Sequence, residues 1–223
     1  NVSVDGGTIK LDGNYPVGSN NVALGNNALS SGSLSGANNT AIGREAMVSN
    51  TSGSLNVALG STTLDANTTG SSNTAVGQAA LGANTTASSN TAVGYQALLL
   101  NTTGAENVAI GRSALDANTT ASNNTAVGGA ALGANTTGAS NTAIGRQALE
   151  ANTTASNNTA VGYQAGFSTT TGDQNTFVGV ETGDAINTGR RNTALGSFSL
   201  TTDTKGSFSV AVGYGALNLQ NFT

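Results

Sequence analysis

Residues Asn124 to Ser140 read N-T-A-V-G-G-A-A-L-G-A-N-T-T-G-A-S, and close variants of this stretch fill most of the chain. The glycine that follows the Ala-Val pair, here called the turn glycine, recurs with a first spacing of 18 residues and then ten spacings of 17. A unit of this length is too short for a helical-pair repeat, which needs about 30 residues or more, so the period predicts a β-solenoid. The turn glycines are Gly25, Gly43, Gly60, Gly77, Gly94, Gly111, Gly128, Gly145, Gly162, Gly179, Gly196 and Gly213.

The residues before each turn glycine are small or β-branched, as in Thr125-Ala126-Val127, and they predict a short strand. We expect a second extended segment to begin at Ala131-Leu132 and a third at the Asn-Thr-Thr sequence. Turns are expected at the turn glycine and at the Gly or Ala that follows Thr-Thr, where positive φ is easiest. The fold class is therefore an all-β parallel β-solenoid, or β-roll, of about twelve coils over residues 21–223. Residues 1–20 form a capping or linking β-segment in this interpretation.

Equivalent residues of successive coils should stack about 4.8 Å apart, the normal separation of strands. The Val, Ile or Leu before the turn glycine and the Leu four residues after it are expected to form two apolar ladders that fill a thin core. The Asn four residues before the turn glycine should form a ladder joined by amide hydrogen bonds. The Ala of the strand would then lie on the opposite, uncharged face. Such a face suits close approach to another chain, so we expect a homo-oligomer.

Two successive coils interrupt the expected Leu ladder, because Gly166 and Gly183 stand where the other coils have Leu or Met. In the same region Phe177 replaces the strand Ala, and Phe167 follows Gly166. Two lost Leu side chains would leave a void, which is destabilising. We therefore expect at least one of the two rings to fill the vacated space. The alternative is a narrowing or kink at the glycines, with both rings exposed as a contact patch.

The composition excludes most catalytic chemistry. The chain has no Cys and no His, so disulfides, thiolate metal sites and the usual general base are missing. Its carboxylates are scattered and lack the pattern of calcium-binding β-rolls. We expect no enzyme activity, no catalytic residue, no cofactor and no metal. With a net charge of −4 and seven basic residues spread along the chain, we expect no nucleic-acid partner.

No apolar run approaches the roughly 18 residues that span a bilayer, so membrane insertion is not expected either. The chain starts with Asn rather than Met, which suggests a processed or excised fragment. All five Phe lie between residues 167 and 222, in a quarter of the chain that either packs differently or contacts a ligand.

Three recurring features allow more than one interpretation. The Asn-Thr-Thr sequences match the pattern of glycosylation acceptors, but the period explains them without sugar. A Thr ladder on a solenoid is also typical of ice-binding surfaces, although adjacent strand residues face opposite sides, so that Thr-Thr exposes one Thr per coil. Arg44, Arg112 and Arg146 each follow a turn glycine and are interpreted as solvated turn residues. No ligand-binding residue can be assigned from these patterns.

The motif N-T-A-V-G or N-V-A-I-G, repeated from Asn21 to Val212, resembles the head repeats of YadA-like trimeric autotransporter adhesins. That resemblance implies a left-handed parallel β-roll, three chains to a head, and binding to host surface molecules. The adhesin repeat is shorter, so the turns must differ here. Residues Val4 to Pro16 (V-D-G-G-T-I-K-L-D-G-N-Y-P), followed by such repeats, resemble fibre or appendage proteins of marine tailed phages.

Together these features predict a structural fibre or adhesin of a virion or cell surface, located outside the cell. The expected partners are identical chains in a homotrimer, other virion or appendage proteins, and a host surface glycan or protein. The alternatives are an ice-binding solenoid and a virion decoration protein that binds no receptor.

Overall fold

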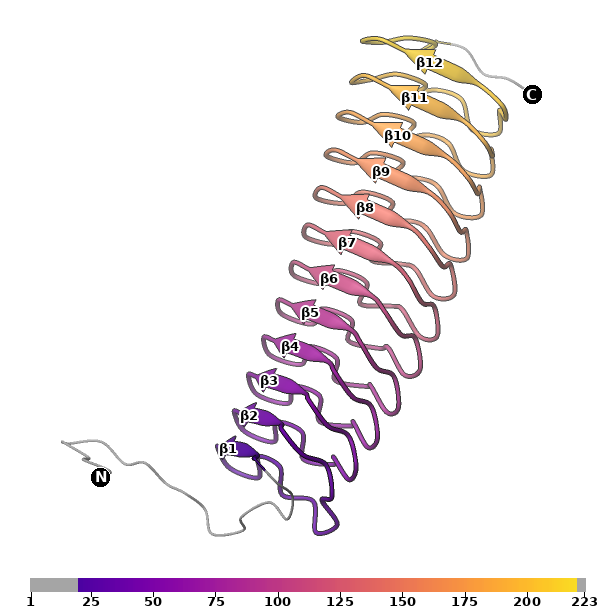
Figure 1. Ribbon diagram of the computed structural model, residues 1–223. Helices are drawn as coiled ribbons and strands as arrows, with labels where there is room; N and C mark the ends of the chain where they lie inside the picture. The colour runs from indigo at the N-terminus through magenta and orange to yellow at the C-terminus, as the bar shows by residue number, and fades with distance from the viewer. Residues whose placement is uncertain (1–19, 220–223) are drawn as a thin grey trace, which may run out of the picture.

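The computed structural model describes residues 20–219, in which every coil contributes one three-residue strand directly before its turn glycine. The twelve strands form one parallel sheet in chain order, so the coils stack into a rod (Figure 1). Equivalent residues pair in register, for example Ala126 with Ala143. The strands are β1 (Val22–Leu24), β2 (Thr40–Ile42), β3 (Val57–Leu59), β4 (Thr74–Val76), β5 (Thr91–Val93), β6 (Val108–Ile110), β7 (Thr125–Val127), β8 (Thr142–Ile144), β9 (Thr159–Val161), β10 (Thr176–Val178), β11 (Thr193–Leu195) and β12 (Val210–Val212).

This architecture confirms the all-β parallel solenoid and its 17-residue coils. The segment expected to cap or link the first coil, residues 1–20, lies almost wholly outside the described residues and stays a prediction. Within residues 20–219 no helix of the length and hydropathy of a membrane span is found.

The rest of each coil turns sharply instead of forming further strands. The expected second strand at Ala131-Leu132 is wrong, because Leu132 has a left-handed φ of 51°. The Asn-Thr-Thr segment does not form a third strand either, although its backbone bonds to the next coil, as from the Thr136 N–H to the Thr153 carbonyl (2.9 Å). A coil of 17 residues around a thin core has to change direction within a few residues, and left-handed corners achieve this.

Left-handed φ values recur at three non-glycine positions per coil: two residues after the turn glycine, four after it and five before the next one. In the coil of β7 these are Ala130, Leu132 and Ser140. The turn glycine itself also has positive φ, as expected, with 136° at Gly128. A side chain there would place its Cβ 2.5 Å from the Gly145 carbonyl oxygen, so glycine is required twice over. The Gly or Ala after Thr-Thr does not adopt positive φ, and that expectation is wrong.

The core is lined by the opposite face of the strand from the one expected. Ala126 is fully buried, whereas Val127 is half-exposed, and the middle residue of the strand is likewise buried from β2 to β12. The interior of each regular coil contains this strand Ala, a second Ala and the Leu, as with Ala126, Ala131 and Leu132. The Leu occupies most of the narrow interior, so only a methyl group fits opposite it. The Val, Ile or Leu of the strand therefore points outward.

In the two coils without Leu, a different large side chain fills the interior. Phe177 in β10 is fully buried, and a Cβ added to Gly166 would lie 2.7 Å from its Cδ2 atom. A Cβ on Gly183 would collide with the other edge of the ring. One aromatic ring thus fills the space of two missing Leu side chains, which confirms the expected compensation. Phe167 is half-buried.

Two ladders of buried Asn side chains add hydrogen bonds between the coils, which compensate for the small apolar area of the thin core. In the strand-Asn ladder, Asn141 donates its backbone N–H (2.9 Å) and its side-chain Nδ2 (3.2 Å) to Oδ1 of Asn124 in the preceding coil. In the loop-Asn ladder, Asn135 donates Nδ2 to Oδ1 of Asn118 (3.0 Å). Asn124 and Asn135 also both donate to the Gly138 carbonyl (2.9 Å each). The expected Asn ladder is confirmed, and a second one accompanies it.

The loop-Asn ladder includes the Asn of every Asn-Thr-Thr sequence. Each is completely buried with its amide bonded inside the rod, so a sugar could not be attached without opening the coil. The period, rather than glycosylation, accounts for the pattern. These residues are Asn67, Asn84, Asn101, Asn118, Asn135 and Asn152.

Candidate functional surfaces

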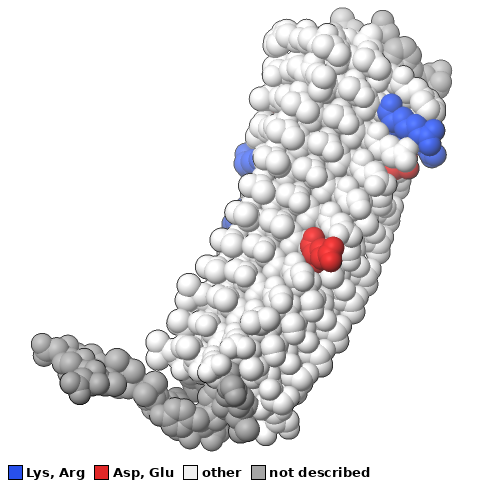
Figure 2. All heavy atoms as spheres, in the orientation of Figure 1, with Lys and Arg blue, Asp and Glu red and all other residues white. Residues whose placement is uncertain are grey.

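The outward face of the sheet carries an apolar ladder along the whole rod. The residue before the turn glycine is Val, Ile or Leu in all twelve strands, and we call this set the sheet ladder. Ile110 and Ile144 are 40% and 41% exposed. The other outward residue of each strand is Thr or Val, so no strand carries a charged residue on this face. Charged side chains are sparse over the whole face shown in Figure 2.

The strand Ala does not face outward, because it lies in the core. The prediction that another chain approaches a surface made of these Ala residues is therefore wrong. The exposed face of the sheet is uncharged as expected, but it is built from β-branched and Leu side chains with Thr.

The Thr-Thr pairs form one exposed ladder, as expected. In the coil of β7, Thr137 is exposed, whereas Thr136 is half-buried and donates its hydroxyl to the Thr153 carbonyl (3.0 Å). The first Thr of each pair thus joins the coils, and only the second meets solvent.

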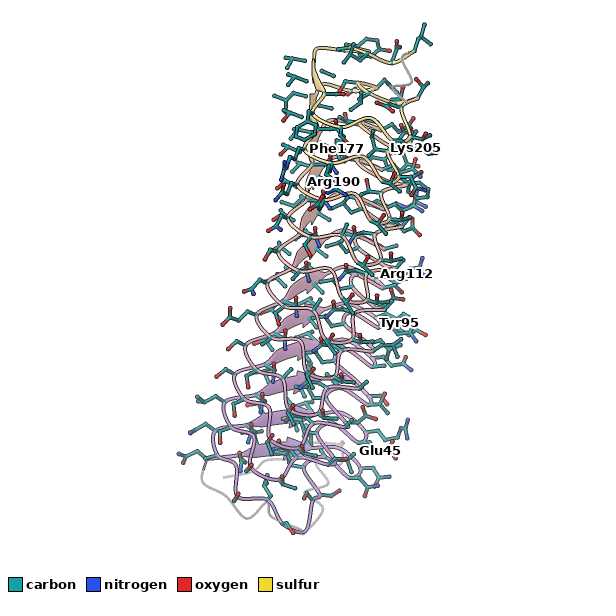
Figure 3. All side chains as sticks on the ribbon, turned by 90° about the vertical axis from the view of Figure 1, so that its right-hand side faces the viewer. Glu45, Tyr95, Arg112, Phe177, Arg190 and Lys205 are labelled. Atoms are coloured by element: carbon teal, nitrogen blue, oxygen red, sulfur yellow. The ribbon has the colours of Figure 1, made fainter. Side chains whose placement is uncertain are left out.

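The corner after the turn glycine carries most of the prominent side chains outside the sheet. Arg44, Arg112 and Arg146 are all exposed there, as expected for turn residues. Tyr95 and Tyr163 occupy the same position in the coil before that of Arg112 and the coil after that of Arg146, and they are 45% and 38% exposed. Figure 3 shows Tyr95 and Arg112 projecting from the same side of the rod. The guanidinium carbon of Arg146 lies 5.8 Å from the ring centroid of Tyr163.

The carboxylates do not converge. Desolvation by burial raises the pKa of Asp65 and of Asp116 above the ordinary value of 3.8. Desolvation, helped by the negative charge of Glu181, raises the pKa of Asp184 to about 6. Each of these Asp side chains lies at the fifth residue after its turn glycine, on separate coils. Within residues 20–219 no group of His, Cys, Asp and Glu side chains is placed to hold a metal ion.

The C-terminal coils expose large apolar and aromatic side chains. Phe208 and Tyr214 are 67% and 82% exposed, and Phe198 packs edge-on against Tyr214 with ring centroids 5.7 Å apart. Arg191 lies over the Phe208 ring, 5.4 Å from its centroid. Of the two interpretations of the Phe-rich quarter, Phe177 supports packing, whereas Phe208 is turned to solvent.

Comparison with models of known protein families, with curated proteins and with solved structures yields no match. The surfaces themselves therefore carry the functional argument.

Proposed function

We propose that the chain is a structural or attachment module of an extracellular fibre, and that it assembles side by side with identical copies through the sheet ladder. The observation that carries this proposal is the continuous apolar ladder on a face without charge. Contiguous exposed apolar patches larger than a few hundred Å² are rare on monomers and typical of interaction sites. A rod with such a ladder along its length is suited to pairing along its length.

The size of the face fits a self-assembly surface. Twelve coils at about 4.8 Å and three residues at about 3.3 Å give a strip of roughly 50 by 10 Å, or about 500 Å². A standard interface buries about 800 Å² on each partner. The strip therefore needs the surface beside it where the strands begin as well, as in a bundle of parallel rods. Three rods, each contacting two others, would bury this adjoining surface, and a trimer is also what the resemblance to adhesin heads implies.

The setting of this module in our proposal is the surface of a virion, or else of a bacterial cell. The resemblance to phage appendage proteins and adhesin heads supports it. In this role the rod holds other appendage proteins at a distance from the particle, or itself contacts a host surface glycan or protein. A decoration protein that binds no receptor would have the same architecture, and labelled negative-stain images of the source particle separate an external appendage from a decorated shell.

Self-assembly is tested by sedimentation velocity on the wild-type chain and on a charged variant of the sheet ladder. Ile110→Lys with Ile144→Lys places two cations on the apolar face and should convert a trimer into a monomer with an unchanged circular dichroism spectrum. The matched control, Thr120→Lys with Thr137→Lys, adds the same charges to the exposed Thr ladder and should stay trimeric. A wild-type chain that is monomeric at high micromolar concentration would contradict the proposal.

Ice binding remains the alternative for an exposed, regularly spaced Thr ladder. The test is thermal hysteresis of the wild-type chain in solution. Ice binding would be favoured over a fibre if two results were found together. The wild-type chain would show hysteresis that the Thr120→Lys and Thr137→Lys variant lacks, and it would not associate with particles.

A further inference from the structure

Five successive coils place a distinctive set of residues at the corner after the turn glycine. Tyr95, Arg112, Gly129, Arg146 and Tyr163 occupy equivalent positions, and we call them the Tyr-Arg row. All but Gly129 are exposed. Because neighbouring coils are about 4.8 Å apart, the backbones of the two arginines lie roughly 10 Å from each other with the glycine between them.

The glycine at the centre of the row has no conformational reason to be there. Gly129 does not have positive φ, and a Cβ built on it would have only the Arg112 carbonyl oxygen nearby, at 4.0 Å. Its neighbour Gly128 is the opposite case, because both its φ and the next coil demand glycine. The missing side chain at position 129 therefore leaves an open gap between two arginines without serving the fold.

The two arginines are not neutralised within the described residues. Arg44, at the equivalent corner of an earlier coil, forms an ion pair with Glu45 (2.7 Å). The residues equivalent to Glu45 in the two coils of the row are Ser113 and Gln147, which carry no charge. Neither arginine of the row forms an ion pair in the described part of the chain.

The surroundings of the row leave both cations available to a ligand and hold Arg146 against an aromatic ring. The ring of Tyr163 lies against the guanidinium of Arg146, which fixes one edge of the gap. The Glu150 carboxylate accepts a hydrogen bond from Gln147 (2.6 Å) instead of pairing with Arg146. Arg112 forms no ion pair with Asp116, whose pKa is raised by burial more than the arginine's charge lowers it.

We propose that the Tyr-Arg row binds an acidic sugar, with its anionic group over Gly129 between the guanidiniums of Arg112 and Arg146. A guanidinium presents a planar fork of donors that matches a carboxylate or a sulfate, and the two arginines flank the gap on neighbouring coils. The exposed ring of Tyr95 supplies an apolar surface for the body of the sugar. The inference rests on the proposed attachment role, to which it adds a ligand class.

The test is isothermal titration of the full chain with three oligosaccharides of equal length: one sulfated, one bearing uronic-acid carboxylates and one neutral. We expect saturable binding of a sulfated or a carboxylated probe and none of the neutral one, and the preferred probe identifies the oxyanion. Arg112→Gln and Arg146→Gln should each weaken binding roughly tenfold or more, because each removes charge-assisted hydrogen bonds. Gly129→Leu should abolish binding by filling the gap, without lowering the melting temperature.

Two controls separate a site from general attraction of anions. Ser61→Leu adds the same side chain at the same corner of a distant coil, and Arg44→Gln removes a charge outside the row; both should bind as the wild type does. Equal binding of the neutral probe, wild-type affinity in Gly129→Leu, or an equal loss in Arg44→Gln would overturn the inference. A wild-type chain that sediments as a trimer yet binds no anionic probe would overturn it while leaving the self-assembly proposal standing.

Discussion

Phe177 shows how tightly side chains pack in the interior of the rod. A regular coil combines one Leu with a strand Ala, whereas the Phe ring lies between two coils whose Leu is replaced by Gly166 and Gly183. The Phe ring thus occupies the same interior space that Leu side chains fill in the regular coils. Close packing of this kind makes both removal and addition of volume destabilising.

Removal of that ring should leave a void that three small residues line. We expect Phe177→Ala to lower the free energy of unfolding by about 3–5 kcal/mol, the range for large aromatic truncations in cores. Chemical denaturation measures the change. A loss well under about 1 kcal/mol would contradict a core role for the ring.

A compensating variant makes the same prediction sharper. Gly166 and Gly183 have φ values of 62° and 61°, close to the 51° that Leu132 adopts at the equivalent position. Phe177→Ala combined with Gly166→Leu and Gly183→Leu should therefore recover most of the lost stability by restoring the regular ladder. The two Leu substitutions without Phe177→Ala should destabilise, because the ring already fills their space.

Asp184 links stability to pH at the same end of the rod. Its pKa is about 6 in the folded chain, raised by desolvation and then by Glu181, against an ordinary value of 3.8. The folded state therefore holds this proton more tightly than the unfolded state does, so stability from this group is full below about pH 4 and falls as pH rises to about 6. Asp184→Asn should raise the melting temperature at pH 7 and leave it unchanged near pH 3.

The pH series has a charge-matched control. Glu106→Gln removes one carboxylate from an exposed corner and serves as the comparison for the loss of one negative charge. A shallower slope should remain in Asp184→Asn, because burial also raises the pKa of Asp65 and Asp116. Equal slopes in the wild type and Asp184→Asn would show that Asp184 does not bind its proton more tightly on folding.

At the scale of one coil, hydrogen bonds substitute for apolar area. A regular coil has two interior Ala and one Leu but two interior Asn, whose side chains donate and accept hydrogen bonds along the rod. Such ladders satisfy buried amides only when every coil repeats the same residue, so one coil cannot be stable alone. The ladders weaken where the repeat fades: Thr169 replaces a loop Asn, and its buried hydroxyl has no partner among the described residues.

At the scale of the whole molecule, stability is a sum over coils and their contacts with neighbours. Deletion of residues 56–72 removes one complete coil and joins Leu55 to Asn73, which preserves every ladder. We expect this variant to unfold cooperatively with a melting temperature only slightly below that of the wild type. Deletion of residues 56–64 removes about half a coil, shifts all ladders out of phase and should abolish cooperative unfolding, as measured by circular dichroism.

The amino-acid sequence by itself determined the period, the position of each strand and one of the Asn ladders, because repetition in a solenoid places identical residues in stacked, equivalent environments. It also predicted that an aromatic ring compensates for Gly166 and Gly183. Alternation assigned Ala126 and Val127 to opposite faces of the sheet, but only the tertiary structure decided which face is inside. The physical reason lies elsewhere in the coil: Leu132 stands at a left-handed corner and sends its side chain into the narrow interior, so that Ala alone fits opposite it. The path of a coil between its strands depends on these corners, and non-glycine residues with positive φ leave no clear signal in the sequence.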